Sequence, residues 1–413
     1  MNTTRRNFCK IVVTAVAGLS LASTIARAAG PKKKRIAAIV VTYGLRTHGD
    51  NVVTRLLEGY WINDRHYEPS CEVASVYVLH APKDNRGDLS QRLSEAYGFR
   101  LSPTIADALT LGTGKLAVDG VLIVSEDGHT HWPKNPFLRF FSAVVDVFQQ
   151  SGRAVPVFND KALSHDWNQA NWMVQQSRNL GFPLLAGSTL AVTFRRPEWD
   201  VPAGAPLEEA VVATGFGEPH IESGAFHGFE LLQAMVERRA GGETGVRAVQ
   251  CLEGKEVWEA AEKGRWSRAL FDAAVARGEG RAKGTPEDLI KHPIALLIEY
   301  NDGLKASVIS TSGLVGGYNF ATRAQGSGEI QSTQAYYVRE NGNSFSCLVN
   351  LFERMMATGK PAFPIERTLL TSGALDFLMR SRRAGHKLLE TPELLAVTYQ
   401  PPAESPFFRG AGS

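Results

Sequence analysis

Two polar loops, each placed directly after a short apolar run, carry the side chains best suited to chemistry. Residues 125–132 (SEDGHTHW) follow VDGVLIV, and residues 159–167 (NDKALSHDW) follow VPVF. An apolar run that ends in such a loop and leads into a helix-compatible stretch is typical of a βαβ unit. Because ligands bind at the carboxyl ends of parallel strands, the sequence predicts a small-molecule site here. Its candidate residues are Glu126, Asp127, His129, His131, Asn159, Asp160, Lys161, His165 and Asp166.

The same alternation of strand and helix extends over residues 35–187 and predicts a Rossmann-like, doubly wound parallel sheet. Residues 35–42 and 73–80 are expected as strands. Residues 89–98 and 104–112 are expected as helices. A further helix is expected where Val52, Val53, Leu56, Leu57 and Tyr60 recur at helical spacing, with Asp50 as its cap.

Beyond residue 187 the pattern changes to successive strands, with Asn301-Asp302-Gly303 as a hairpin turn. The sequence therefore predicts an α+β domain with an open, mainly antiparallel sheet over residues 188–345. One helix is expected over residues 217–242 and a single amphipathic helix over residues 257–278. Closing helices follow over residues 346–395, and residues 396–413 form a tail.

The N-terminal 28 residues resemble an export signal. Arg5 and Arg6 lie in TRRNFCK, an apolar run follows over residues 11–26, and Ala26-Arg27-Ala28 fits a cleavage site. The alternative, a retained membrane anchor, is disfavoured because the run is shorter than the roughly 20 apolar residues that a span needs. We therefore expect export to the periplasm by the twin-arginine route, with no stable membrane anchor after cleavage.

Charge and cysteine content exclude several classes of protein. The chain has a formal charge of +3, but its first 28 residues hold four basic side chains and no acid, so the rest is close to neutral. A chain that is close to neutral lacks the excess of basic residues that is typical of nucleic-acid-binding proteins. Cys71, Cys251 and Cys347 are widely scattered, so neither a disulfide framework nor a cysteine metal site is expected.

The order of domains resembles the glucose-fructose oxidoreductase, inositol dehydrogenase and MocA (Gfo/Idh/MocA) family. VPVFNDKALS is similar to the strand that ends in the family's Glu-Lys-Pro motif, with Lys161 on the lysine and Ala162 in place of proline. GAFHGFELLQAMVERRAGG is similar to its Gly-x-His-x-x-Asp helix, with His227 on the histidine and Glu230 on the acid. The resemblance implies an oxidoreductase that acts on a sugar, sugar acid or polyol with NAD or NADP. It also implies catalytic roles for Lys161, which would polarise a hydroxyl, and for His227, which would remove its proton.

The dinucleotide motif departs from the family pattern. A Gly-x-Gly-x-x-Gly loop lets the pyrophosphate approach a helix N-terminus, but here Tyr43 and Leu45 add bulk beside Gly44. His80 stands where an acid is expected at the end of the second strand, and Ser223 stands where the family has an acid four residues before the histidine. The resemblance still places a cofactor near Gly44, Arg46, His48, His80 and Glu126, with Arg46 on a phosphate. It places the substrate near His129, His131, His165, Asp166 and Glu222.

Two other classes of function are open at this point. His129-x-His131 with Asp127, Glu126, His165 or Asp166 could bind a divalent metal in a lyase, isomerase or hydrolase of carbohydrates. Alternatively, the chain is a non-catalytic periplasmic binding protein that has kept the fold and lost the cofactor. The family resemblance also implies a homo-oligomer formed through the open sheet.

Overall fold

The computed structural model describes residues 32–126, 132–338 and 342–410. The described residues from Lys33 onward form one compact unit that contains a six-stranded, an eight-stranded and a two-stranded sheet. The export signal expected over residues 1–28 lies outside the described residues. No helix in the described part of the chain is long and apolar enough to cross a membrane.

The first sheet has six strands, all parallel, in the order β5-β4-β1-β6-β7-β8. This is the doubly wound order that the sequence predicts. The strand bounds are β1 Lys34–Val40, β4 Cys71–Val78, β5 Arg100–Leu101, β6 Gly120–Val124, β7 Val157–Asp160 and β8 Leu184–Gly187.

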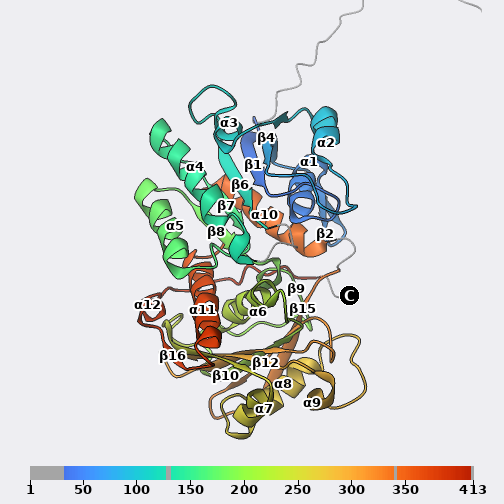
Figure 1. Ribbon diagram of the computed structural model, residues 1–413, viewed down its shortest axis with the longest axis vertical. Coiled ribbons are helices and arrows are strands. Elements are labelled where there is room, and N and C mark those ends of the chain that lie inside the picture. Colours follow the sequence, from blue (N-terminus) through green and yellow to red (C-terminus); the bar gives the residue numbers. More distant parts are fainter. Residues whose placement is uncertain (1–31, 127–131, 339–341, 411–413) are drawn as a thin grey trace, which may run out of the picture. The chain divides into compact units, whose positions relative to one another are not determined.

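Helices cover both faces of this sheet because side chains alternate along its buried strands. Ala37 and Ile39 of β1 join a core with α3 (Ile105–Thr110), α4 (Phe137–Ser151) and α5 (Trp167–Leu180). Ile36 and Ala38 point to the other face. There they join a core with the π-helical turn η1 (Asp50–Thr54), α1 (Arg55–Glu58), α2 (Ser90–Tyr97) and α10 (Asn343–Thr358). The first of the closing helices, α10, therefore lies on the first sheet (Figure 1).

The second sheet has eight strands in the order β16-β11-β12-β13-β10-β14-β15-β9 and is antiparallel except between β10 and β13. The strand bounds are β9 Phe194–Arg196, β10 Leu207–Thr214, β11 Val246–Glu253, β12 Ile294–Tyr300, β13 Lys305–Ser310, β14 Tyr318–Ala324, β15 Ile330–Tyr336 and β16 Leu389–Glu390. Helices α6 (Ile221–Val236) and α11 (Glu366–Arg383) pack on one face. Helices α7 (Lys255–Glu262) and α8 (Arg268–Val275) pack on the other. Short helices α9 (Pro286–Leu289) and α12 (Pro392–Leu395) complete this part.

Three local predictions are wrong. Tyr60 lies outside the first helix, because Gly59 at φ 83° ends α1 and Tyr60–Ile62 pairs with Arg65–Tyr67 as the hairpin β2–β3. The helix expected over residues 257–278 is divided at Gly264, whose φ of 67° closes α7. Asp50 does not act as the N-cap, since Gly49 occupies that position.

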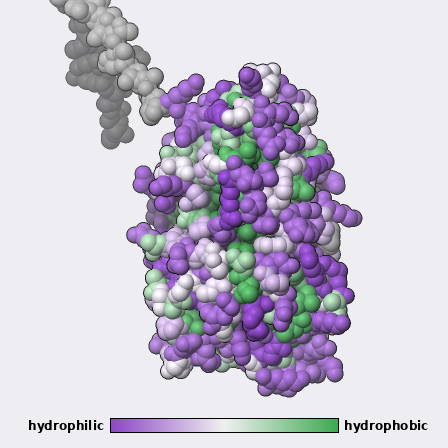
Figure 2. Space-filling view, turned by 90° about the vertical axis from the view of Figure 1, so that its left-hand side faces the viewer, coloured by the Kyte–Doolittle hydropathy of each residue, from purple (hydrophilic) through white to green (hydrophobic). Residues whose placement is uncertain are grey.

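The face built around α4, α5 and α12 is predominantly hydrophilic in Figure 2, where apolar residues form small groups separated by polar ones. Single exposed apolar residues are normal on protein surfaces. The candidate residues Glu126 and Lys161 lie at the carboxyl edge of the first sheet.

Candidate active site

A buried ion pair stands at the ends of β6 and β7. Lys161 Nζ lies 2.7 Å from Glu126 Oε1, and both side chains are almost fully buried. Ser223 of α6 donates a hydrogen bond to the same carboxylate oxygen, at 3.3 Å. The backbone of Lys161 is left-handed, with φ 64°, and its N–H donates to Gly187 O at the end of β8. Strained non-glycine residues of this kind persist where the surrounding structure holds them, often at functional sites.

His227 faces this pair from α6. Its Nδ1 is 2.5 Å from Ser188 Oγ, and Ser188 directly follows the Gly187 that binds the backbone of Lys161. Burial lowers the pKa of His227 well below its ordinary value, and the positive charge of Lys161 and that of His48 act in the same direction. The imidazole is therefore neutral near pH 7 and able to accept a proton.

A carboxyl group lies behind His227, one turn further along α6. Glu230 Oε2 accepts the N–H of Ser188 at 3.1 Å, and Oε1 accepts the hydroxyl of Thr371 at 2.5 Å. Burial raises the pKa of Glu230 to about 7, although both of these hydrogen bonds act to lower it. Glu230 thus fixes the backbone of the residue that binds His227.

A second imidazole belongs to the same centre. His48 Nδ1 lies 2.6 Å from Asp160 Oδ2, and Asp160 is buried while His48 is one-fifth exposed. The ring of His48 meets the edge of Phe345, with centroids 4.9 Å apart. Because Nδ1 of His48 contacts Asp160, Nε2 is the ring nitrogen of His48 that can contact a ligand.

A cavity of about 620 Å³ lies beside the two imidazoles. His48 and His227 line it together with Arg46, Arg55, Tyr318 and Tyr337. Aromatic rings, imidazoles and guanidinium groups around one hollow suit a small polar ligand with several hydroxyl groups. Four buried oxygens at the ends of β6 and β7 have no hydrogen-bond partner within the described structure: Ser125 Oγ, Glu126 Oε2, Asn159 Oδ1 and Asp160 Oδ1. The centre is therefore rich in acceptors that need donors.

The loop after β1, where a dinucleotide phosphate would be expected, is closed. Thr47 Oγ1 accepts the N–H of Gly44 and of Asp50, and Asp50 Oδ2 accepts the N–H of Arg46 at 2.7 Å. The N–H of Leu45 donates to Arg86 O at 3.3 Å. A Cβ on Gly44 would come within 2.5 Å of Pro82 Cγ and 2.7 Å of Gly87 O. In this conformation the loop does not fit a pyrophosphate, because its N–H groups and the bare face of Gly44 already contact protein.

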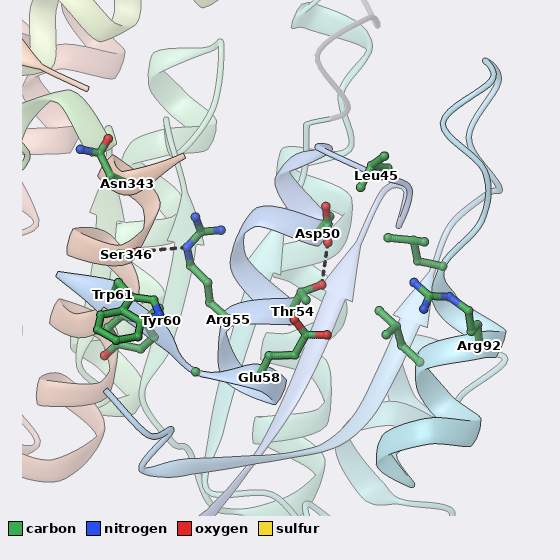
Figure 3. Close-up of a pocket in the computed structure, with 13 residues that line it drawn as sticks. Leu45, Asp50, Thr54, Arg55, Glu58, Tyr60, Trp61, Arg92, Asn343 and Ser346 are labelled. Atoms are coloured by element: carbon green, nitrogen blue, oxygen red, sulfur yellow. Dashed lines mark hydrogen bonds between the residues drawn. The ribbon is translucent and has the colours of Figure 1, made fainter. Parts of the chain in front are cut away.

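A second cavity, of about 580 Å³, lies beside the helical segment that follows this loop. Figure 3 shows its wall, with Asp50 bonded to Thr54 and Arg55 reaching Ser346 of α10. Leu45, Asp50 and Arg55 line both this cavity and the larger one. The helical segment therefore lies between two cavities, and His48 and His227 line the larger one.

The remaining predicted site residues lie elsewhere. His165, Asp166 and Glu222 line a separate cavity of about 180 Å³, where Asp166 Oδ1 also caps α5 by accepting the N–H of Gln169. His80 is half-buried and contacts the carbonyl of Ala81. His129, His131 and Asp127 lie outside the described residues.

No group of three or more His, Cys, Asp and Glu side chains in the described segments could hold a metal ion. His129 and His131, on which the metal alternative depends, lie outside these segments.

Two members of the centre are not assigned a role by the sequence. In the sequence, Asp160 is one of several ionisable residues in this loop, and nothing distinguishes it from the others. Its pairing with His48 joins segments that are 112 residues apart. Ser188 carries no motif signal. Its position directly after the β8 strand is the feature that could have indicated it.

No family model and no curated protein sequence matches the chain. Solved structures do match. The myo-inositol 2-dehydrogenase from Lactobacillus plantarum gives a TM-score of 0.53 at 11% identity, covering 87% of this chain and 99% of that one. The apo scyllo-inositol dehydrogenase from Lactobacillus casei gives a TM-score of 0.53 at 12% identity, and the match covers 87% of this chain and 98% of that one. The myo-inositol dehydrogenase from Lactobacillus casei, in complex with NAD(H) and myo-inositol, gives a TM-score of 0.53 at 10% identity. That match covers 87% of this chain and 97% of the other.

These likenesses establish the fold. A parallel doubly wound sheet followed by a mixed sheet with α6 and α11 on its inner face is the architecture of the Gfo/Idh/MocA oxidoreductases. The chain has that fold, as its sequence predicts.

Proposed function

We propose that this protein is an oxidoreductase that acts on a hydroxyl group of a sugar, sugar acid or polyol, with NAD or NADP as the hydride acceptor. The observation that carries the proposal is the proximity of the Lys161 charge to neutral His227, which itself lines a cavity of about 620 Å³. Solved structures of this fold include an inositol dehydrogenase with NAD(H) and myo-inositol and GenD2 with NAD. Carrying that cofactor over to this chain belongs to the proposal.

The chain's own residues supply the acid–base part of the reaction. Lys161 uses one N–H on Glu126 and keeps two donors for the substrate oxygen. His227 accepts the proton of that hydroxyl, held in orientation by Ser188. Polar side chains that line the cavity, among them Arg46, His48 and Tyr337, are placed to contact further hydroxyl groups of the substrate, which is the reason for expecting a polyhydroxylated molecule.

The test is a screen of the purified mature protein with NAD and NADP against inositols, aldoses, sugar acids and linear polyols. We expect reduced nicotinamide to form with at least one of them, and a dissociation constant for one nucleotide below about 100 μM. Absence of both reduction and nucleotide binding, in protein that also carries no nucleotide as isolated, would contradict the proposal.

A second candidate is favoured by the closed loop after β1. A cofactor-free lyase or isomerase could use the His48–Asp160 pair and His227, whose imidazoles line the same cavity, as two acid–base groups acting on a carbohydrate. Conversion of a sugar or sugar acid without any nucleotide, lost on His48→Gln, would favour this candidate over the first.

A further inference from the structure

The connection between β4 and α2 lies over the loop that would bind a dinucleotide phosphate. We call residues 81–89 the strap. Leu89 N donates to Tyr43 O at 2.8 Å, and Leu45 N donates to Arg86 O at 3.3 Å. Gly44 forms an isolated antiparallel bridge with Asp88, and Pro82 packs on its bare face. The strap thus occupies the side of Gly44 that a ligand would approach.

The strap leaves no room for a side chain at residue 44, so this position requires glycine. A side chain at residue 44 would collide with Pro82 Cγ at 2.5 Å and Gly87 O at 2.7 Å. In a dinucleotide site the same absence of a side chain lets a pyrophosphate approach the backbone. Protein and phosphate therefore compete for one surface.

The strap is held by few contacts. Most of its residues are exposed, and only Pro82, Arg86 and Leu89 are half-buried. The Arg86–Asp84 ion pair, at 2.7 Å, lies within the strap. Gly87 has a φ of 68°, and a side chain added there would meet nothing within 4 Å, so the strap has room to rearrange. Lifting it breaks two backbone hydrogen bonds, the contact of Pro82 with Gly44 and the packing of Leu89 against the core.

We propose that the strap is an autoinhibitory cover, and that a dinucleotide binds only to the state in which residues 81–89 have lifted off Gly44. This inference rests on the proposed function, since it concerns how NAD or NADP reaches the site. A ligand that binds only the open state shifts the equilibrium toward it, and its apparent affinity is reduced by the rarity of that state. The strap therefore sets the apparent affinity for the nucleotide.

Calorimetric titration with NAD and NADP tests the inference on the wild type, Pro82→Gly and a matched control, Asn85→Gly. Asn85 is an exposed residue of the same strap, so the control adds an equally flexible glycine without removing the contact on Gly44. We expect Pro82→Gly to bind the preferred nucleotide about tenfold more tightly than the wild type, and the control to bind within about twofold of it. Unchanged thermal unfolding midpoints show that all three proteins are folded.

Trypsin gives a second measurement that needs no turnover, because Lys83 and Arg86 lie in the strap. Saturating nucleotide should accelerate cleavage at these two residues several-fold in the wild type. Equal affinities for the wild type and Pro82→Gly, with unchanged cleavage, would mean that the nucleotide binds with the strap in place. That result overturns the inference and leaves the proposed function intact. If no variant binds either nucleotide, both the cover and the proposed cofactor are overturned.

Discussion

At the scale of single residues, the centre depends on keeping one imidazole neutral beside one ammonium group. Burial and the charge of Lys161 both lower the pKa of His227, while Glu126 compensates the charge of Lys161. We expect Lys161→Met and His227→Gln each to lower kcat by about 10²-fold or more, the usual size of a general acid–base contribution. Steady-state kinetics on the substrate found in the screen measure this.

Matched controls for these variants are Lys305→Met and His292→Gln, both at exposed positions of the second domain. Their kcat should stay within about twofold of the wild type. Full activity of both Lys161→Met and His227→Gln would remove these residues from the mechanism.

Asp50 and Arg46 are expected to act on a bound nucleotide in opposite directions. The Asp50 carboxylate accepts the N–H of Arg46 at the start of the helical segment, where a phosphate would otherwise be favoured. Arg46 is exposed and lines the large cavity. Calorimetry should show several-fold tighter nucleotide binding for Asp50→Asn. It should show about tenfold weaker binding for Arg46→Ala, the loss of one charge-assisted hydrogen bond. The same direction of change in both variants would contradict a phosphate at this position.

At the scale of elements, α6 must be held firmly because it carries His227. Arg367 of α11 is fully buried and forms a two-bonded ion pair with Glu237, the residue after α6. One of these bonds is 2.8 Å from Nε to Oε2. Tyr399 donates a further hydrogen bond to the same carboxylate, at 2.7 Å. The pair ties the closing helix to the helix of the site.

Breaking that pair leaves a carboxylate buried without its cation. Arg367→Met should lower the free energy of unfolding by about 3–5 kcal/mol, measured by urea denaturation. Arg383→Met, at an exposed position near the end of the same helix, is the control and should change it by less than about 0.5 kcal/mol. Equal stability of the two variants would show that the pair does not hold α11 to α6.

Elements were predictable where a regular pattern repeats along several residues. The apolar runs of β1, β6 and β7 and the loops after them place Lys161 at the carboxyl edge of the sheet, and helical spacing places His227 on α6. The β2–β3 hairpin could not be predicted, because Tyr60 continues the helical spacing of Val52 and Leu56 until Gly59 turns the chain. The strap could not be predicted either, since its contacts join two irregular loops.

At the scale of the whole molecule, the expected export signal remains a prediction that a fractionation experiment can test. The paired residues Arg5 and Arg6 are the feature that a twin-arginine route requires. Replacing both with Lys keeps the charge and should leave unprocessed precursor inside the cell, whereas we expect the wild type to be cleaved and to reach the periplasm. Normal processing of the double variant would contradict the assignment.

The stability of the folded chain should depend on pH through Glu230. Burial raises the pKa of this carboxyl from 4.5 to about 7. Below pH 4.5 the group is protonated in both the folded and the unfolded chain. Between about pH 4.5 and 7 only the folded chain keeps the proton, so stability falls as the pH rises, and the full contribution is lost above pH 7.

The size of this effect follows from the difference between the two pKa values and is about 3 kcal/mol. Glu230→Gln removes the titration and keeps a neutral side chain of the same shape between Ser188 and Thr371. Urea denaturation at several pH values between about 5 and 8 should therefore show the wild type losing stability relative to Glu230→Gln by that amount. Parallel curves for the two proteins would mean that Glu230 is already ionised at pH 5, and that hydrogen bonds from Ser188 and Thr371 outweigh its burial.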